Sequence, residues 1–398
     1  MFDTDLTPST PSHIAFTGNP IILRDDFDLS TQALHGYPFN VELNGVNIYT
    51  GRFNYPYSIN IANIINSFID YLPEPDARQY VDSGPLIRIE SPEEFARRFV
   101  FVQFNGEYDR EFAFYALPGG VSRQNLNWLS GMSDRDIFTC RFLAKNTNCF
   151  LSSRTNGWSI TIKETEIYPL YFINDNWDDE FTIVEKLTGK SLTIDCIDPG
   201  VYALDIEALR RKFFDEHGLL ANSFEVFHQG QFACRIVIEQ AELSKERYRL
   251  KFRNSLGVFE IIEVTGELTV NPEWSGDDDA TFSIYNPITD GYVSTRERVG
   301  CKRRLSISSR VKHPDEILFL MDMLSSDEVY LLDMSPSPVR VIPTTEELSF
   351  KLRPDVPSSF NLFLDLVEDE AFILPDIFDT SDFRRPKVFT KQFTKQFN

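Results

Sequence analysis

The sequence is poor in the residues that build metal sites and disulfide frameworks. It contains five cysteines and five histidines in 398 residues. The cysteines are odd in number and include no CxxC pair, and no two histidines have the His-x-x-x-His spacing of a zinc site. We therefore expect reduced cysteines, no metal site and no other cofactor.

Long apolar runs are also missing. No run approaches the roughly 18 residues that a membrane-spanning helix needs. The first residues, Met1 to Leu6, have neither the basic region nor the apolar core of a secretory signal. These two absences predict a chain that is made in the cytoplasm and does not insert into a membrane.

Positive charge is scarce, because 39 Lys and Arg residues face 60 Asp and Glu residues and leave a formal net charge of -21. A surface this acidic repels phosphate backbones and anionic lipids, so we expect no sequence-specific nucleic-acid binding. An ordinary solubilising charge explains the acidity. An acidic lumen through which DNA slides without sticking is the alternative.

Hydrophobic residues are plentiful, and their pattern is mostly that of strands. Apolar residues make up 42% of the chain, with 35 Phe. The dipeptides Asn44-Gly45 and Asn105-Gly106 supply the positive φ values of tight hairpin turns, and apolar residues alternate from Phe360 to Leu366. The expected fold class is mainly β, with several β-sandwich or barrel-like domains and a few short helices packed on them.

Three helices are expected from caps and apolar spacing. Ser58 is placed to cap a helix that carries apolar residues from Ile61 to Leu72, and Asp205 is placed to cap a second helix. In the second helix, Ile206, Leu209 and Phe213 should face inward. The third helix is expected at 314–325, beginning at Pro314.

Turn signals and changes in composition divide the chain into five parts. An N-terminal arm (1–12) precedes three β-rich domains, and a basic Phe-rich arm (371–398) ends the chain. The domains are a β domain with one helix (13–120), a second β-rich domain (121–245), and a third that includes the helix at 314–325 (246–370).

No catalytic motif is complete, so we expect that the protein is not an enzyme. Gly189-Lys190-Ser191 lacks the glycine of a phosphate-binding loop, since Val184 stands five residues earlier. The glycines near Ser122 precede it instead of flanking it as in a nucleophile elbow. Acidic loops at 175–180 and 277–279 could bind calcium or simply be solvated, and the many carboxylates leave glycoside hydrolysis open.

The C-terminal segment carries the interaction site that the sequence predicts. Between 383 and 398 it has five basic residues and no acidic one, with phenylalanine repeating every four residues. That spacing gives an apolar stripe flanked by cations, which requires a partner surface. A frayed terminus is the alternative. The candidate interaction residues are Arg384, Arg385, Phe389, Lys391, Phe393, Lys395 and Phe397.

Two segments, 252–267 (FRNSLGVFEIIEVTGE) and 324–333 (LSSDEVYLLD), carry a resemblance to known proteins. There the chain resembles virion proteins of tailed bacteriophages and prophages of gut bacteria. The resemblance is clearest over 232–366, and the turn at 116–120 (ALPGG) agrees with it.

The resemblance implies a structural subunit of a phage tail, tail tip or baseplate ring, located in the virion. Its partners would be copies of itself in a symmetric ring and other tail proteins, with arms exchanged between neighbours. The alternative is a receptor-binding adhesin that holds host surface glycan on exposed loops, where Trp177 and Trp274 could stack on sugars. Both tryptophans suit core packing equally well.

Overall fold

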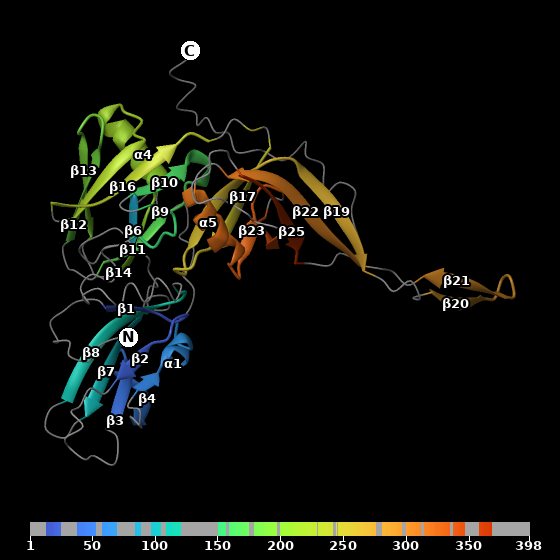
Figure 1. The fold of residues 1–398 in the computed structure, drawn as a ribbon, viewed down its shortest axis with the longest axis horizontal. Helices are drawn as coiled ribbons and strands as arrows, with labels where there is room; N and C mark the ends of the chain where they lie inside the picture. The colour runs from blue at the N-terminus through green and yellow to red at the C-terminus, as the bar shows by residue number, and fades with distance from the viewer. Residues whose placement is uncertain are drawn as a thin grey trace. The chain divides into compact units, whose positions relative to one another are not determined.

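The fold of the computed structural model is mainly β with several sheets, as the sequence predicts (Figure 1). None of the helices among the described residues is long and apolar enough to cross a membrane. The structure describes residues 13–24, 38–52, 58–69, 84–88, 97–104, 109–120, 150–156, 159–174, 179–196, 200–228, 230–241, 244, 246–275, 281–296, 300–311, 314–334, 337–346 and 358–367.

The chain divides into two compact units that are not continuous in sequence. Unit 1 comprises residues 1–163, 167–239 and 253–260, and unit 2 comprises 164–166, 240–252 and 261–398. Residues 253–260 therefore belong to unit 1, although the residues directly before and after them belong to unit 2. The domain boundaries expected near residues 120, 245 and 370 stay predictions.

The first sheet of unit 1 is a five-stranded sheet in which the hairpin predicted at Asn44-Gly45 is confirmed. Asn44 has a φ of 53° and Gly45 a φ of 74°, as a tight hairpin turn requires. Phe99 and Phe114 stack in the core on adjacent strands, with ring centroids 5.8 Å apart. The order is β1 (His13–Phe16), β8 (Asp109–Leu117), β7 (Arg97–Phe104), β3 (Pro38–Leu43) and β4 (Val46–Arg52).

The helix expected after Ser58 is present, but the predicted cap is wrong and the helix ends at Asn66, before the expected Leu72. Ser58 lies in β5 (Ser58–Asn60), which pairs with β2 (Ile22–Arg24), and α1 spans Ala62–Asn66. The Oδ1 atom of Asn60 accepts hydrogen bonds from the N–H groups of Ile21 (3.0 Å) and Ala62 (3.1 Å). Because Ser58 pairs in a strand, the helix begins three residues later than a cap at Ser58 would set, and Asn60 satisfies its first N–H.

Two further sheets and a helix complete the strands and helices among the described residues of unit 1. The six-stranded sheet contains β13 (Ser191–Cys196), β12 (Asp179–Glu185), β15 (Ser223–His228), β16 (Gln231–Glu239), β10 (Ser159–Lys163) and β9 (Thr155–Asn156) in that order. The three-stranded sheet contains β11 (Leu170–Asn174), β14 (Gly200–Leu204) and β6 (Leu86–Arg88). Two of the pairings in unit 1 are parallel, β1 with β8 and β10 with β16.

Helix α4 (Ile206–His217) confirms the predicted cap at Asp205. The carboxylate of Asp205 accepts hydrogen bonds from the N–H groups of Glu207 (2.8 Å) and Ala208 (3.2 Å). Ile206, Leu209 and Phe213 are buried, as their spacing predicts. Gly218 ends the helix in the left-handed conformation with a φ of 66°.

Unit 2 is built on a seven-stranded sheet with one helix packed on it. The helix predicted at 314–325 is present as α5 (Pro314–Leu324), and its Phe319 contacts Phe252 of the sheet, with ring centroids 5.0 Å apart. The strand order is β18 (Phe259–Thr265), β17 (Arg247–Arg253), β23 (Val329–Leu331), β24 (Val339–Thr345), β25 (Ser358–Leu366), β22 (Gly300–Val311) and β19 (Leu268–Ser275). A short 3-10 helix, η3 (Glu164–Glu166), also belongs to unit 2.

Between β19 and β22, the chain forms a separate two-stranded sheet. β20 (Thr281–Asn286) and β21 (Gly291–Arg296) pair with each other over their whole length (Figure 1). No other strand among the described residues pairs with either of them. We refer to residues 281–296 as the β20–β21 hairpin.

Candidate interaction surface

The β20–β21 hairpin has one face formed by apolar side chains. Its antiparallel register sets Ile284 opposite Val293 and Tyr285 opposite Tyr292. Because directly opposed residues share a face and successive residues alternate, Phe282, Ile284 and Val293 lie on one face. Ser283, Tyr285 and Tyr292 lie on the other. We call the face of Phe282, Ile284 and Val293 the apolar face.

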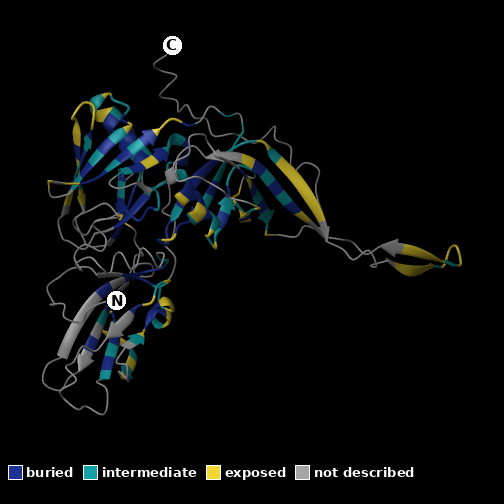
Figure 2. Ribbon diagram, in the orientation of Figure 1, coloured by how far each residue is buried: buried dark blue, intermediate teal, exposed yellow. Residues whose placement is uncertain are grey.

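The apolar face is exposed to solvent. Phe282 is 50% exposed, Ile284 52% and Val293 50%, so each presents about half of its surface to water (Figure 2). At the turn, Ile288 is 91% exposed. An isolated two-stranded hairpin is only marginally stable in water, and a cluster of exposed apolar side chains commonly marks an interaction site.

Side-chain contacts order the opposite face and the turn. The hydroxyl of Tyr285 donates a 2.6 Å hydrogen bond to Oδ1 of Asp290, and the rings of Tyr285 and Tyr292 meet edge to face with centroids 5.6 Å apart. The bond to Asp290 raises the pKa of Tyr285, because deprotonation would break it. The Oδ1 atom of Asn286 accepts a 3.0 Å hydrogen bond from the N–H of Ile288. The turn is thus held by its own side chains.

The hairpin is electrically neutral in a strongly acidic chain. Its sixteen residues include one acidic residue, Asp290, and one basic residue, Arg296, whereas the whole chain carries -21. The strand register places neither charged position on the apolar face, because Arg296 is opposite Thr281 and Asp290 lies in the turn.

The outer face of the sheet in unit 2, on the side away from α5, has a different chemistry. Arg304 on β22 forms an ion pair with Asp365 on β25, with its Nε 2.7 Å from Oδ1. Its Nη1 lies 3.5 Å from Oε1 of Glu273 on β19. Lys251 lies over the ring of Tyr330, 5.2 Å from its centroid. These side chains form an ordinary solvated sheet face, in contrast to the apolar face of the hairpin.

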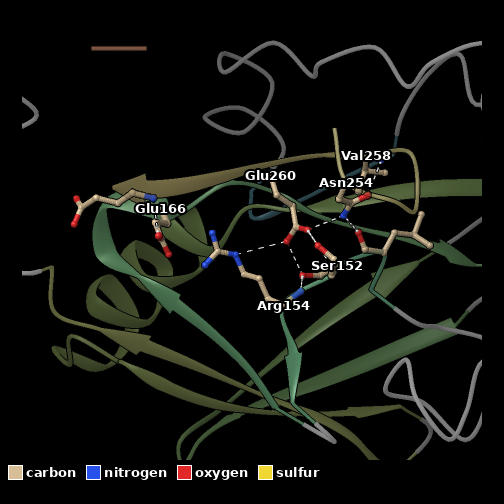
Figure 3. A network of polar contacts seen from close by, with 9 residues as sticks. Ser152, Arg154, Glu166, Asn254, Val258 and Glu260 are labelled. Atoms are coloured by element: carbon tan, nitrogen blue, oxygen red, sulfur yellow. Dashed lines mark hydrogen bonds and ion pairs between the residues drawn. The ribbon is translucent and has the colours of Figure 1, made fainter. Parts of the chain in front are cut away.

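A buried polar network in unit 1 holds the turn between β17 and β18 (Figure 3). Oε1 of Glu260 accepts a 2.6 Å hydrogen bond from the hydroxyl of Ser152. Oε2 of Glu260 accepts hydrogen bonds from Nδ2 of Asn254 (2.6 Å) and from the N–H of Ser153 (3.0 Å). Arg154 adds an ion pair, with its Nε 3.7 Å from Oε1. Glu260 thus fastens the turn to residues 152–154.

Asn254 closes the same turn from inside. Its Oδ1 accepts hydrogen bonds from the N–H groups of Leu256 (3.0 Å) and Val258 (3.2 Å), and its Nδ2 also donates to the carbonyl of Leu151 (3.0 Å). Leu256 and Val258 are buried in the main hydrophobic core of unit 1. The turn is therefore part of that core.

Glycines let three backbone segments approach closely beside this turn. The N–H of Gly18 donates to the carbonyl of Gly119 (2.7 Å), and the N–H of Gly120 donates to the carbonyl of Ser255 (2.7 Å). A Cβ atom on Gly119, whose φ is +97°, would lie 2.2 Å from the carbonyl oxygen of Ser255. We call this contact the glycine junction. It joins the 116–120 turn to the start of the 252–267 segment.

Most of the candidate residues from sequence fall outside the described residues. This holds for the C-terminal residues Arg384, Arg385, Phe389, Lys391, Phe393, Lys395 and Phe397. It also holds for Ser122, Trp177, the hairpin turn at Asn105-Gly106 and the acidic residues 277–279. Trp274 lies in β19, whose end at Ser275 precedes that acidic segment.

Other motifs weighed in the sequence are placed by the structure. Gly189 and Lys190 lie in the turn between β12 and β13, where Gly189 has a φ of 68°, and Ser191 begins β13. This motif is therefore part of a β-hairpin and does not have the structural context of a phosphate-binding loop. Cys234 is buried and is not in a disulfide. Within the described ranges, no group of three or more His, Cys, Asp and Glu residues is placed to hold a metal ion.

The sequence analysis missed the β20–β21 hairpin as a site. Its signals were present, since Phe282 and Ile284 alternate with polar residues and Asp290-Gly291 is a turn dipeptide. What they do not reveal is that no other strand in the described part of the chain pairs with the hairpin. The exposure of an apolar face depends on the tertiary fold.

Comparisons with known proteins do not identify a family. No protein-family model matches the chain, and no curated protein sequence matches it. Among solved structures, the chain has a weak similarity to a calcium-stabilised adhesin that helps an Antarctic bacterium bind ice. The two are 7% identical, the match covers 83% of this chain and 82% of that one, and the TM-score is 0.15. A similarity at this level carries no argument about the fold or function of this chain.

Proposed function

We propose that the protein is a structural subunit of a multi-copy assembly in the tail of a bacteriophage, in a tail, tail-tip or baseplate ring. It acts by associating with copies of itself and with other tail proteins, and it carries out no catalysis. The tail is proposed from the resemblance of residues 232–366 to virion proteins.

The observation that carries the proposal of self-association is the β20–β21 hairpin. Phe282, Ile284 and Val293 are about half exposed on one face of a sheet of only two strands. Covering this face by a partner would remove apolar surface from water and stabilise the hairpin at the same time. A subunit that works by association would use such a segment, whereas a catalytic site would need convergent polar groups in a concave pocket.

The proposal is tested by the mass and symmetry of the purified full-length chain. We expect light scattering to give a mass several times the 46.0 kDa of one chain, and negative-stain class averages to show closed rings. A monomer at every concentration would contradict the proposal. A closed assembly would support self-association, and labelling of purified virions with an antibody against the chain would then test the place in the tail.

A second candidate function is the binding of host glycan by the opposite face of the hairpin. Tyr292 is 76% exposed, and Tyr285 beside it is joined to the carboxylate of Asp290. Exposed aromatic rings can stack on a sugar, and a neighbouring carboxylate can accept hydrogen bonds from the hydroxyl groups of the sugar. A glycan array probed with the wild-type chain and with Tyr292→Ala tests this function, because loss of a signal in the variant would support it.

A further inference from the structure

The apolar face of the β20–β21 hairpin is continuous across both strands. Ile284 and Val293 are directly opposed, and Phe282 lies two residues from Ile284 on the same face. All three side chains are about half exposed. A partner that covers one of them would thus contact the others as well.

The chemistry of this face determines which partner suits it. Phe282, Ile284 and Val293 carry no charge, so the face offers nothing to attract a basic peptide or an anionic lipid headgroup. Asp290 is hydrogen bonded to Tyr285, which lies on the opposite face. An uncharged apolar partner surface is therefore the best complement, and the same face of a second copy has this chemistry.

Charge favours a second copy at the hairpin in particular. Two copies of a chain with a net charge of -21 repel each other over most of their surfaces. The hairpin has one acidic and one basic residue and is neutral. Contact through the hairpin keeps charge repulsion low, and two ribbons of the same right-handed twist can stack face to face.

We propose that the apolar face of the β20–β21 hairpin packs against the same face of the hairpin of a second copy. This contact rests on the proposed function, since it names the surface through which copies associate. A contact of this kind is isologous, because the same residues are used by both copies. It joins copies in pairs, so an assembly in which every hairpin is paired has an even number of copies.

The first test uses a charge placed on either face of the same strand in the full-length chain. Ile284→Asp puts a carboxylate on the apolar face, whereas Ser283→Asp puts the same charge on the opposite face one residue away. We expect Ile284→Asp to weaken association at least tenfold and Ser283→Asp to leave it near the wild-type value, by light scattering over a concentration series. Equal effects of the two variants would overturn the proposal.

The second test detects the contact directly. Ile284→Cys should form a cross-linked dimer with a short bismaleimide, because its side chain faces the same side chain of the other copy. Ser283→Cys should not do so beyond the background of the five native cysteines, which the wild-type chain measures. Stronger cross-linking of Ser283→Cys than of Ile284→Cys would overturn the proposal even if an aspartate variant failed to fold.

The outcomes separate this proposal from the proposed function. If the wild-type chain assembles and Ile284→Asp assembles equally well, the hairpin contact is wrong and self-association through another surface stands. If the wild-type chain is a monomer at all concentrations, both proposals fail. If a monomer binds neutral lipid vesicles or a glycan array and Ile284→Asp abolishes that binding, a different partner covers the apolar face and the second-copy proposal is overturned.

Discussion

The hydroxyl of Ser152 donates a 2.6 Å hydrogen bond to Oε1 of Glu260, and the two residues are 108 positions apart in the chain. Both are buried in unit 1. Their contact joins the segment just before β9 to the start of β18, next to the turn between β17 and β18. A buried carboxylate costs free energy unless donors surround it. Here two serines, Asn254 and Arg154 provide those donors.

Replacing Glu260 should therefore destabilise unit 1. Glu260→Ala leaves the donors of Ser152 and Asn254 buried without their acceptor, and we expect a loss of about 3 kcal/mol in the free energy of unfolding. Glu260→Gln keeps one acceptor oxygen and should lose about 1 kcal/mol. Urea unfolding measures both, with Glu267→Gln at an exposed position as the control. A loss in Glu260→Ala no larger than that of the Glu267→Gln control would mean that the network contributes little.

The glycine junction predicts a strong dependence on side-chain size at Gly119. A Cβ atom there would lie 2.2 Å from the carbonyl oxygen of Ser255, and the φ of +97° already disfavours alanine. We expect Gly119→Ala to lose about 3 kcal/mol or more by thermal unfolding. Gly230→Ala is the control, because Gly230 also has a positive φ, +74°, but no atom within 4 Å of a Cβ. It should lose only about 1 kcal/mol.

Glu185 in the β12–β13 hairpin predicts a pH dependence. Burial raises its pKa, but hydrogen bonds from the backbone of Leu187 and from the backbone and hydroxyl of Thr188 outweigh burial, so the net pKa is lowered. A lowered folded pKa stabilises the folded state above the unfolded pKa of about 4.3, and this stabilisation is lost as the pH falls through the folded value.

Thr188→Ala removes one of these donors, which lies 2.8 Å from Oε2 of Glu185. We expect it to lower stability by about 1 kcal/mol at pH 7 and by less below the folded pKa, where the carboxyl is protonated. Denaturant unfolding at several pH values from about 2.5 to about 7 measures how the stability difference between Thr188→Ala and the wild type changes with pH. Thr188→Ser keeps the hydroxyl and should restore wild-type behaviour. A loss that does not change with pH would rule out the carboxylate as the cause.

Asp205 at the start of α4 should show the opposite pH dependence. Burial raises its pKa and is only partly offset by hydrogen bonds from the N–H groups of Ala208 and Glu207. The unfolded chain then loses this proton first, so stability falls as the pH rises from about 3.9 to the raised folded pKa.

Two substitutions at Asp205 separate the charge from the cap. Asp205→Asn keeps an acceptor for the helix N–H groups without the charge, so it should be at least as stable as the wild type at pH 7 and should lose that pH dependence. Asp205→Ala removes the cap as well, so it should be about 1 kcal/mol less stable than Asp205→Asn at every pH. Thermal unfolding over this pH range gives both results, and a pH dependence retained in Asp205→Asn would assign it to another group.

Local chemistry made part of the fold predictable from sequence. The φ values of Asn44 and Gly45, the cap at Asp205 and the helix that begins at Pro314 all follow from residue types that fix nearby backbone geometry. The Ser58 cap failed because Ser58 pairs in β5 and lies four residues before α1 begins, and the pairing of β5 with β2 depends on residues far away in sequence. The parallel pairs β1–β8 and β10–β16 have the same long-range origin.

The candidate site was less predictable than the fold. Alternation at Phe282 and Ile284 indicates a strand. The same alternation occurs at Phe360 and Leu362 of β25, but these two side chains are buried in the core of unit 2. Only the tertiary structure distinguishes the two. The charge and phenylalanine repeat of the C-terminal segment remain a prediction, because they lie outside the described residues.

The turn at 254–258 also sets an order of events during synthesis. Unit 1 uses the chain up to residue 239 and then needs residues 253–260, so its core stays open until the ribosome has passed Glu260. At the usual rate of about 5–20 residues per second, this delay is about a second or more after residue 239 is made. A fragment that ends before the turn leaves the N–H of Gly120 and the hydroxyl of Ser152 without the acceptors they have in the full chain, Ser255 and Glu260. The nascent chain should therefore be most vulnerable to proteases and chaperone capture in that interval.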